Sequence, residues 1–156
     1  METTMRLFVI ALALLAAIPA WAANIDDKLI VKKSPHSVAA TVDRLAEALK
    51  KRGIGIAARV DHAAAAERVG EKLPPTQLLI FGNPKLGTPL MQANRKAGLE
   101  LPMKVLAWAD DSGQVWLAYA KPAILKAEYA ISGRDNVFAA MEQALDTLTN
   151  EAVKDK

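Results

Sequence analysis

A hairpin pattern in the second half of the chain constrains the fold more than any other feature. Residues 102–109 and 114–120 form two apolar runs, and Asp111-Ser112-Gly113 between them fits a three-residue turn with Gly113 in the left-handed conformation. Such a turn places Trp108 directly opposite Trp116. Both faces of this hairpin are apolar, unlike those of an ordinary half-solvated ribbon. The pattern therefore predicts an antiparallel strand pair that needs cover from other elements or from a partner.

The other segments of the chain are short and are separated by glycine, proline and capping residues. Together with the hairpin they give the order β-α-β-α-β-α-β-β-α-α. This order predicts an α+β fold, a single two-layer domain with a mixed sheet of about five strands. The remaining strands are expected at 28–33, 54–60 and 77–81, and the helices at 37–51, 61–69, 88–98, 122–129 and 135–152.

The first 22 residues have the features of a secretory signal. Arg6 precedes the apolar run 7–18, Pro19 follows, and Ala20 and Ala22 occupy the −3 and −1 positions of a cleavage site. The run is too short for a membrane span of roughly 20 residues, although an uncleaved N-terminal anchor is the alternative. We therefore expect cleavage after Ala22, a single mature domain over 23–156, a periplasmic or secreted location, and no stable membrane insertion after cleavage.

Composition excludes several classes of function. The chain has 20 Lys and Arg against 17 Asp and Glu, a net charge of +3, and the basic residues alternate with acids instead of forming a stripe with aromatic residues. This pattern disfavours nucleic acid as a partner. The absence of cysteine excludes disulfides, thiolate metal sites and a cysteine nucleophile.

The first candidate ligand-binding site is the turn that ends the strand at 77–81. Asn83 as a helix cap, with Pro84 in the first turn, would leave backbone N–H groups pointing outward, and Lys85 would add positive charge. Such a helix start can bind an anion. The alternative is a structural turn that simply ends the strand.

Asp61 and His62 form the second candidate, because they also follow a strand and begin a helix. They could supply a general base or a metal ligand, and we expect them at the same edge of the sheet as Asn83. The alternative is an Asp cap followed by a solvated His. With only two histidines in the chain, a zinc site is disfavoured.

Trp108 and Trp116 form the third candidate. On the expected register they share one face of the hairpin with Leu106 and Ala118. Helices could cover this face within the monomer. The alternative is an open aromatic patch for a second subunit or an apolar ligand.

Several segments resemble a known family, the domain of unknown function 302. The resemblance covers roughly residues 34–130 and excludes the final helix. It implies a small α+β domain, often exported, with no established enzymatic activity, so it gives no catalytic residue. The segments that carry it are Thr41-Val42-Asp43-Arg44-Leu45, Ile56 to His62, Gln77 to Met91 with its Phe81-Gly82-Asn83-Pro84-Lys85 core, Leu101-Pro102-Met103-Lys104 and Gln114 to Tyr119.

These observations favour an exported, non-enzymatic binding or interaction module. Its expected partners are a second copy of the chain in a homodimer and a small apolar or anionic ligand. We predict no catalytic residue, no cofactor and no metal. The alternative function is a small periplasmic enzyme or metal-binding protein in which Asp61 and His62 lie near Asn83 and Lys85.

Overall fold

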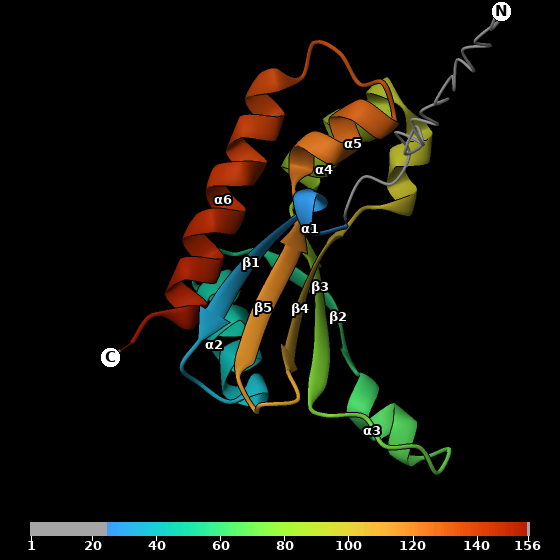
Figure 1. Ribbon diagram of the computed structural model, residues 1–156. Helices are drawn as coiled ribbons and strands as arrows, with labels where there is room; N and C mark the ends of the chain where they lie inside the picture. Colours follow the sequence, from blue (N-terminus) through green and yellow to red (C-terminus); the bar gives the residue numbers. More distant parts are fainter. Residues whose placement is uncertain (1–24, 156) are drawn as a thin grey trace, which may run out of the picture.

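The computed structural model describes residues 25–155 and contains one five-stranded sheet (Figure 1). The strands follow the spatial order β1-β5-β4-β3-β2, so that β1 and β2 are the edges. The α+β class and the predicted order of elements are confirmed. The strands are β1 (Leu29–Ser34), β2 (Gly55–Asp61), β3 (Thr76–Gly82), β4 (Met103–Ala109) and β5 (Val115–Ala120).

The sheet is antiparallel throughout, and in this respect the prediction of a mixed sheet is wrong. Each of the four neighbouring strand pairs runs antiparallel. The reason lies in the connections between strands. Parallel neighbours need a crossover over a face of the sheet, whereas α3 (His62–Glu67) is a short helix at the end of the sheet, between β2 and β3. The chain therefore turns back beside the strand that it has just left.

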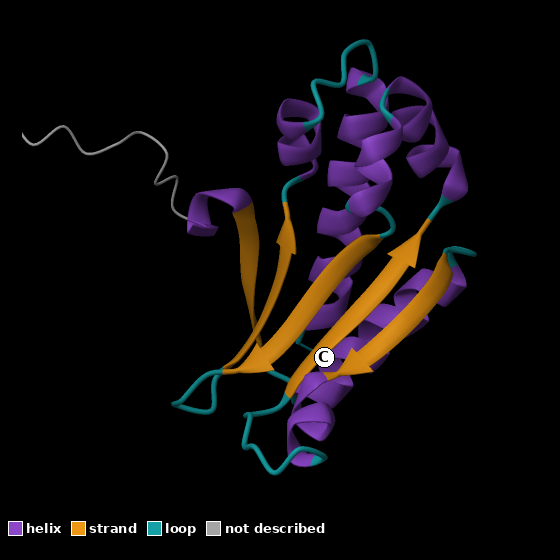
Figure 2. Cartoon of the chain, turned by 90° about the vertical axis from the view of Figure 1, so that its right-hand side faces the viewer, coloured by secondary structure: helices purple, strands orange, loops and turns teal. Residues whose placement is uncertain are grey.

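Two helices, α2 (Val38–Lys51) and α6 (Asp135–Val153), lie on one face of the sheet (Figures 1 and 2). The remaining helices lie around the ends of the strands. They are α1 (Ile25–Lys28), α3, α4 (Pro84–Ala93), the 3-10 helix η1 (Arg95–Leu99) and α5 (Pro122–Glu128). The domain is thus two layers, and helices cover one face of its sheet.

Local side-chain caps account for most helix starts. Ser37 accepts a hydrogen bond from the Ala40 N–H at the start of α2, and Asp61 accepts one from the Ala64 N–H at the start of α3. The expected helix start at Thr88 is wrong. Helix α4 begins at Pro84, because the Asn83 side chain caps it and proline suits a first helical position.

The hydrophobic core lies between the helices and the covered face of the sheet. The side chains that alternate toward this face are buried, while α2 and α6 contribute apolar stripes at helical spacing. The buried residues include Leu45 and Leu49 of α2, Leu79 and Phe81 of β3, Val105 of β4, Leu117 of β5, and Leu145 and Leu148 of α6.

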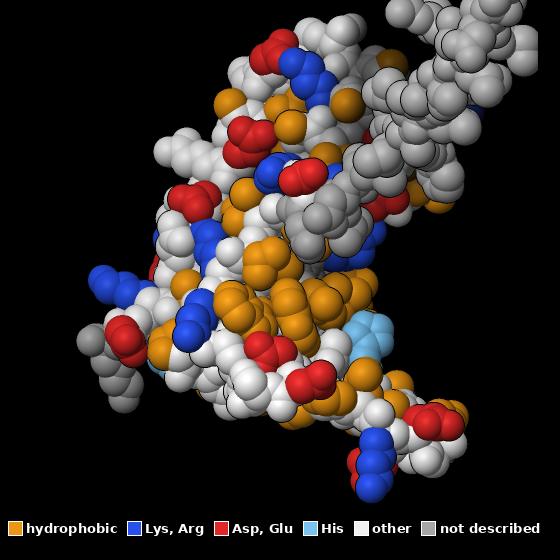
Figure 3. Space-filling view, viewed as in Figure 1, with side chains coloured by type: hydrophobic (Ala, Val, Ile, Leu, Met, Phe, Trp, Pro, Cys, Tyr) orange, Lys and Arg blue, Asp and Glu red, His pale blue; other side chains and the backbone are white. Residues whose placement is uncertain are grey.

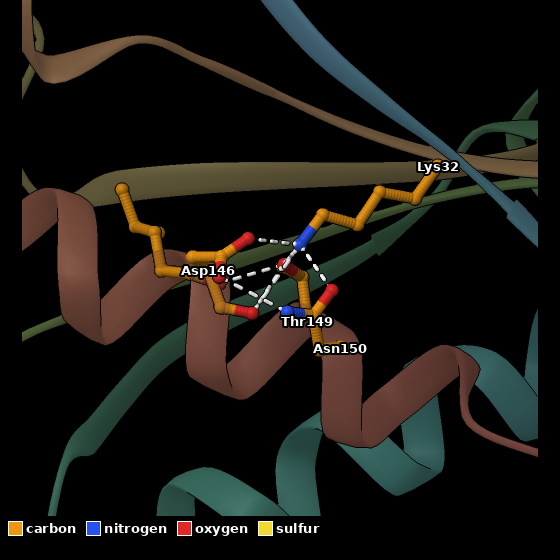
Figure 4. A network of polar contacts seen from close by, with 5 residues as sticks. Lys32, Asp146, Thr149 and Asn150 are labelled. Carbon is orange, nitrogen blue, oxygen red and sulfur yellow. Dashed lines mark hydrogen bonds and ion pairs between the residues drawn. The ribbon is translucent and has the colours of Figure 1, made fainter.

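A charged network holds α6 to the edge strand β1 (Figure 4). The Lys32 side chain is only 14% exposed. Its Nζ atom donates hydrogen bonds to Asp146 Oδ1 at 2.7 Å, Thr149 Oγ1 at 2.8 Å and Asn150 Oδ1 at 2.6 Å. A largely buried ammonium group is tolerated only when it is paired and hydrogen-bonded in this way. The network therefore fixes the position of α6 along the strand.

Candidate functional site

An apolar cavity of about 460 Å³ lies at the end of the β2–β3 pair, against helix α6. Five segments build its walls: the α2–β2 turn with the start of β2, the end of β3, helix α4, the start of β4, and α6. The lining residues are Gly53, Ile54, Gly55, Ile56, Ala57, Phe81, Gly82, Asn83, Pro84, Leu86, Gly87, Thr88, Met91, Leu101, Pro102, Met103, Met141, Ala144, Leu145 and Leu148. This set, all of it within the described part of the chain, includes no charged side chain.

The cavity has an exposed mouth and a buried floor. The start of β2 and the first turns of α4 line the mouth, where Ile56, Pro84 and Thr88 are exposed. The floor is formed by buried side chains of the core, among them Met103 and Leu145. The two polar side chains of the lining, Asn83 and Thr88, both belong to the start of α4. Polarity and exposure therefore decrease together from the mouth to the floor.

All three methionines within residues 25–155 line this cavity. Met91 comes from α4, Met103 from β4 and Met141 from α6, so three elements each contribute one. Methionine is unbranched and flexible, and it is common on binding surfaces that adapt to their ligands. Their convergence on one cavity distinguishes this wall from an ordinary aliphatic core.

Glycine contributes to the open space. Gly87 lies inside α4, where glycine is less favourable than alanine by roughly 0.5–1 kcal/mol. A Cβ atom at this position would meet only Leu101 Cδ1 within 4 Å, at the ordinary contact distance of 3.7 Å. No close backbone approach therefore requires glycine here. Its effect is to leave room beside Leu101, which also lines the cavity.

Asn83 lies on the rim of the cavity, but Lys85 is not part of the lining. The Asn83 Oδ1 atom accepts a hydrogen bond from the Lys85 N–H at 3.0 Å and so caps α4. The Lys85 side chain is exposed. The structure thus gives Asn83 the capping role that the sequence suggested, and it places the residue next to a cavity that the sequence did not predict.

Asp61 and His62 lie at the opposite end of the sheet from Asn83, so the expectation that these residues share one edge is wrong. Asp61 pairs with Gln77 and Gly55 with Gly82 in the antiparallel β2–β3 register. Gln77 and Gly82 are five residue steps apart along β3, about 17 Å at ~3.3 Å per residue. The ends of the two strands would lie at the same edge of the sheet only if the strands ran parallel.

Asp61 itself has a structural role. Its carboxylate caps α3 through the Ala64 N–H and also accepts a hydrogen bond from the Gln77 side chain. The backbone hydrogen bond is the main cause of its lowered pKa, and the Gln77 bond lowers it further. Within residues 25–155, no group of three or more His, Asp or Glu side chains is arranged to hold a metal ion.

Trp108 and Trp116 pair directly across the β4–β5 hairpin, as predicted. Gly113 has a φ angle of +82° and occupies the expected left-handed position of the turn. The Trp116 Nε1–H donates to Asp110 Oδ2 at 2.7 Å. This bond is the main reason that the pKa of Asp110 falls to about 2, and hydrogen bonds from Ser112 and Gln114 lower it further.

The two tryptophans belong to an open face of the sheet, opposite to α2 and α6. One row of this face crosses all five strands through Val31, Ala118, Leu106, Leu78 and Val60. Figure 3 shows hydrophobic side chains gathered over the middle strands on this side. Trp108 and Trp116 are half-buried, and neither α2 nor α6 lies over this face.

The sequence did not predict this cavity. Its walls come from five segments that individually have ordinary strand, turn or helix patterns. The one available signal was the distribution of methionine and glycine: Met91, Met103 and Gly87 all flank the strand ends where the cavity forms. That signal has meaning only once the strand register is known.

Residues 30–148 match the family described as "Domain of unknown function DUF302". The chain belongs to this family. The match continues beyond residue 130, where the resemblance was expected to end, and includes most of α6. This extent agrees with the packing of α6 in the core.

Two curated relatives that match the chain are longer than it is. It is 44% identical over 138 residues to "Fluoride-specific ion channel FluC 1" of Brucella suis biovar 1 (strain 1330), which covers 88% of this chain and 54% of the relative. The protein of the same name from Brucella abortus biovar 1 (strain 9-941) is also 44% identical over 138 residues, 51% of its length. The chain thus spans about half the length of these relatives. Within residues 25–155, no helix is long and apolar enough to cross a membrane.

The fold also occurs in a crystal structure of an uncharacterized conserved DUF302 protein from Bacillus stearothermophilus. The TM-score is 0.72 at 20% sequence identity, and the alignment covers 80% of this chain and 97% of the other. At this identity the similarity establishes the fold alone.

Proposed function

We propose that this protein is an exported, non-enzymatic binding module whose ligand site is the cavity between the sheet end and α6. The observation that carries this proposal is the cavity itself, with about 460 Å³ of space and apolar, uncharged walls. Pockets for small molecules commonly have volumes of 300–1,000 Å³, mostly apolar walls and a few polar groups that orient the ligand. Asn83 and Thr88 are the polar groups at this mouth.

The positions of the titratable residues support binding over catalysis. General acid–base chemistry needs its groups within hydrogen-bond reach of one reacting atom. Asp61 and His62 lie about 17 Å along the sheet from Asn83. The enzyme alternative requires these side chains to converge on one site, and they do not converge.

The test is a titration with a neutral apolar fluorophore, 1-N-phenylnaphthylamine, against the mature protein. We expect saturable binding at one site. Gly87→Leu should weaken it at least tenfold, because the new side chain enters the cavity beside Leu101. Gln92→Leu adds the same side chain to an exposed position of the same helix, outside the cavity lining, and should bind the probe like the wild type.

Two outcomes contradict the proposal. One is an absence of saturable binding to the wild type. The other is equal affinity in the wild type and Gly87→Leu, with circular dichroism showing that both are folded. The second outcome would place the probe elsewhere, for example on the open sheet face.

We also infer that the open sheet face joins two copies of the chain in a homodimer. Its central row is uncharged across all five strands, with Val31 44% exposed at the edge. A sheet of this size offers a face of roughly 20 by 20 Å, on which Lys33 and Lys104 lie beside the apolar row. Exposed apolar surface with polar residues at its rim is typical of interaction sites. A second copy is the partner that matches this row, because a two-fold axis brings identical apolar surfaces together.

Sedimentation velocity tests the homodimer. We expect the wild type to sediment as a dimer, and Leu106→Lys, in the middle of the row, to sediment as a monomer. Val69→Lys, at a residue that is 74% exposed and outside the sheet, should leave the dimer intact. The inference would be refuted if the wild type stays monomeric over a 100-fold range of protein concentration, or if the Leu106→Lys variant still sediments as a dimer.

A further inference from the structure

The structure also indicates the chemical class of the ligand. We propose, on the basis of the proposed binding function, that the cavity takes the unbranched hydrocarbon tail of a single-chain amphiphile. The polar head stays at the mouth, and Gly87 sets how much of the tail enters.

The orientation of the ligand follows from the gradient of polarity. The floor consists of buried apolar side chains, including Phe81, Met141 and Leu148. A polar group placed there would lose its hydration without gaining a hydrogen-bond partner, which is costly. Asn83 and Thr88 at the mouth can hydrogen-bond a head group, and water reaches this end. Only an elongated molecule that is apolar at one end and polar at the other satisfies both regions.

The methionines favour a flexible tail over a rigid ring system. Each of the three wall elements α4, β4 and α6 presents one methionine to the cavity. Unbranched thioether side chains change rotamer at little cost and fill irregular gaps, so such walls follow a chain that bends differently at each length. Phe81 is the sole aromatic side chain in the lining, and the cavity therefore lacks a pair of aromatic walls between which a planar ligand could stack.

Gly87 determines the depth that the tail can use. It lies in α4 among the residues that line the cavity, and the Cδ1 atom of the lining residue Leu101 lies 3.7 Å from the position that a Cβ atom of residue 87 would take. A larger residue would occupy the same space as the tail. The backbone of Gly87 does not have a positive φ angle, so a larger residue at this position does not strain the helix.

The experiment is displacement of 1-N-phenylnaphthylamine by a series of 1-alkanols from six to twelve carbons. Burial of each methylene contributes about 0.8 kcal/mol, so we expect affinity to rise about fourfold per carbon until the cavity is full, and then to level off. In Gly87→Leu the levelling should begin at a shorter chain. Gln92→Leu should reproduce the wild-type series.

The outcomes separate this inference from the proposed function. If the fluorophore binds in the cavity but alkanol affinity does not increase with chain length, the aliphatic ligand is refuted and the binding module remains. The aliphatic ligand is also refuted if compact ring compounds such as naphthalene displace the fluorophore with higher affinity than any alkanol does. If Gly87→Leu lowers affinity for all chain lengths equally, Gly87 does not set the depth. If the fluorophore itself fails to bind, the proposed function is refuted first.

Discussion

Replacing Lys32 with methionine removes the ammonium group that holds α6 to the edge strand β1. Methionine keeps most of the aliphatic stem, so the change isolates the polar contacts. Three side-chain acceptors lose their donor: Asp146, Thr149 and Asn150. Because α6 forms one wall of the apolar cavity, its position is relevant to the proposed binding as well as to stability.

The size of the effect follows from burial. A hydrogen bond with a charged partner contributes about 1.5–3 kcal/mol, and the Lys32 side chain is only 14% exposed. Water can replace the ammonium at the exposed side chain of Asn150, and Thr149 retains its bond to the Leu145 carbonyl at 2.7 Å. We therefore expect Lys32→Met to lower the free energy of unfolding by about 2 kcal/mol. For a domain of this size this corresponds to a Tm about 8 °C lower.

Urea unfolding at several pH values is the assay. Its matched control is Lys33→Met, the next residue, whose exposed side chain should change stability by less than about 0.5 kcal/mol. The hydrogen bond from Lys32 holds the pKa of Asp146 below its usual 3.8. A lowered pKa stabilises the fold above the unfolded value and ceases to do so as the pH falls through the folded value. The difference between the wild type and Lys32→Met should therefore be largest near pH 7 and smaller near pH 3.

Two results would refute this reasoning. Equal stability of Lys32→Met and Lys33→Met at pH 7 would show that the network makes no net contribution to the free energy of unfolding. A difference that stays constant from pH 7 to pH 3 would show that the Asp146 carboxylate takes no part in the stabilisation.

Three further predictions concern the leader and the hairpin. Mass spectrometry of the protein from its native cell envelope should find a mature chain that begins at Ala23, and an intact leader would contradict export with cleavage. Trp116→Phe removes the main hydrogen bond that lowers the pKa of Asp110, so an NMR titration should show this pKa rising from about 2 toward 3.8; an unchanged value would assign the shift to Ser112 and Gln114. Gly113→Ala should lower the free energy of unfolding by about 1 kcal/mol, because φ is +82° there, and urea unfolding that shows no loss would contradict the turn conformation.

Local rules were sufficient for much of the fold. Ser37, Asp61 and Gly113 occupy the cap and turn positions that the sequence predicted. The tryptophan pairing followed from the turn alone, because a three-residue turn fixes the register of both strands. These features depend on residues a few positions apart, where the chemistry of single side chains decides the conformation.

Features that depend on distant segments could not be predicted in the same way. The sequence indicated a strand before Asp61 and another before Asn83, but it did not show their relative direction. Because the two strands run antiparallel, the two predicted sites lie at opposite ends of the sheet. The start of α4 was ambiguous because both Pro84 and Pro89 can occupy a first helical turn. The cavity needed the register, the helix positions and the shape of five segments at once.

The three methionines offer the most direct test of the cavity as the ligand site. Met91, Met103 and Met141 are the methionines of the described chain, and all three line it. Mature protein labelled with ¹³C at the methionine methyl groups should give three methyl signals, and titration with 1-decanol should shift all of them. Gly87→Leu should show smaller shifts at the same ligand concentration. Binding of decanol that leaves the three methyl signals unchanged would contradict the account, because the ligand would then lie elsewhere on the protein.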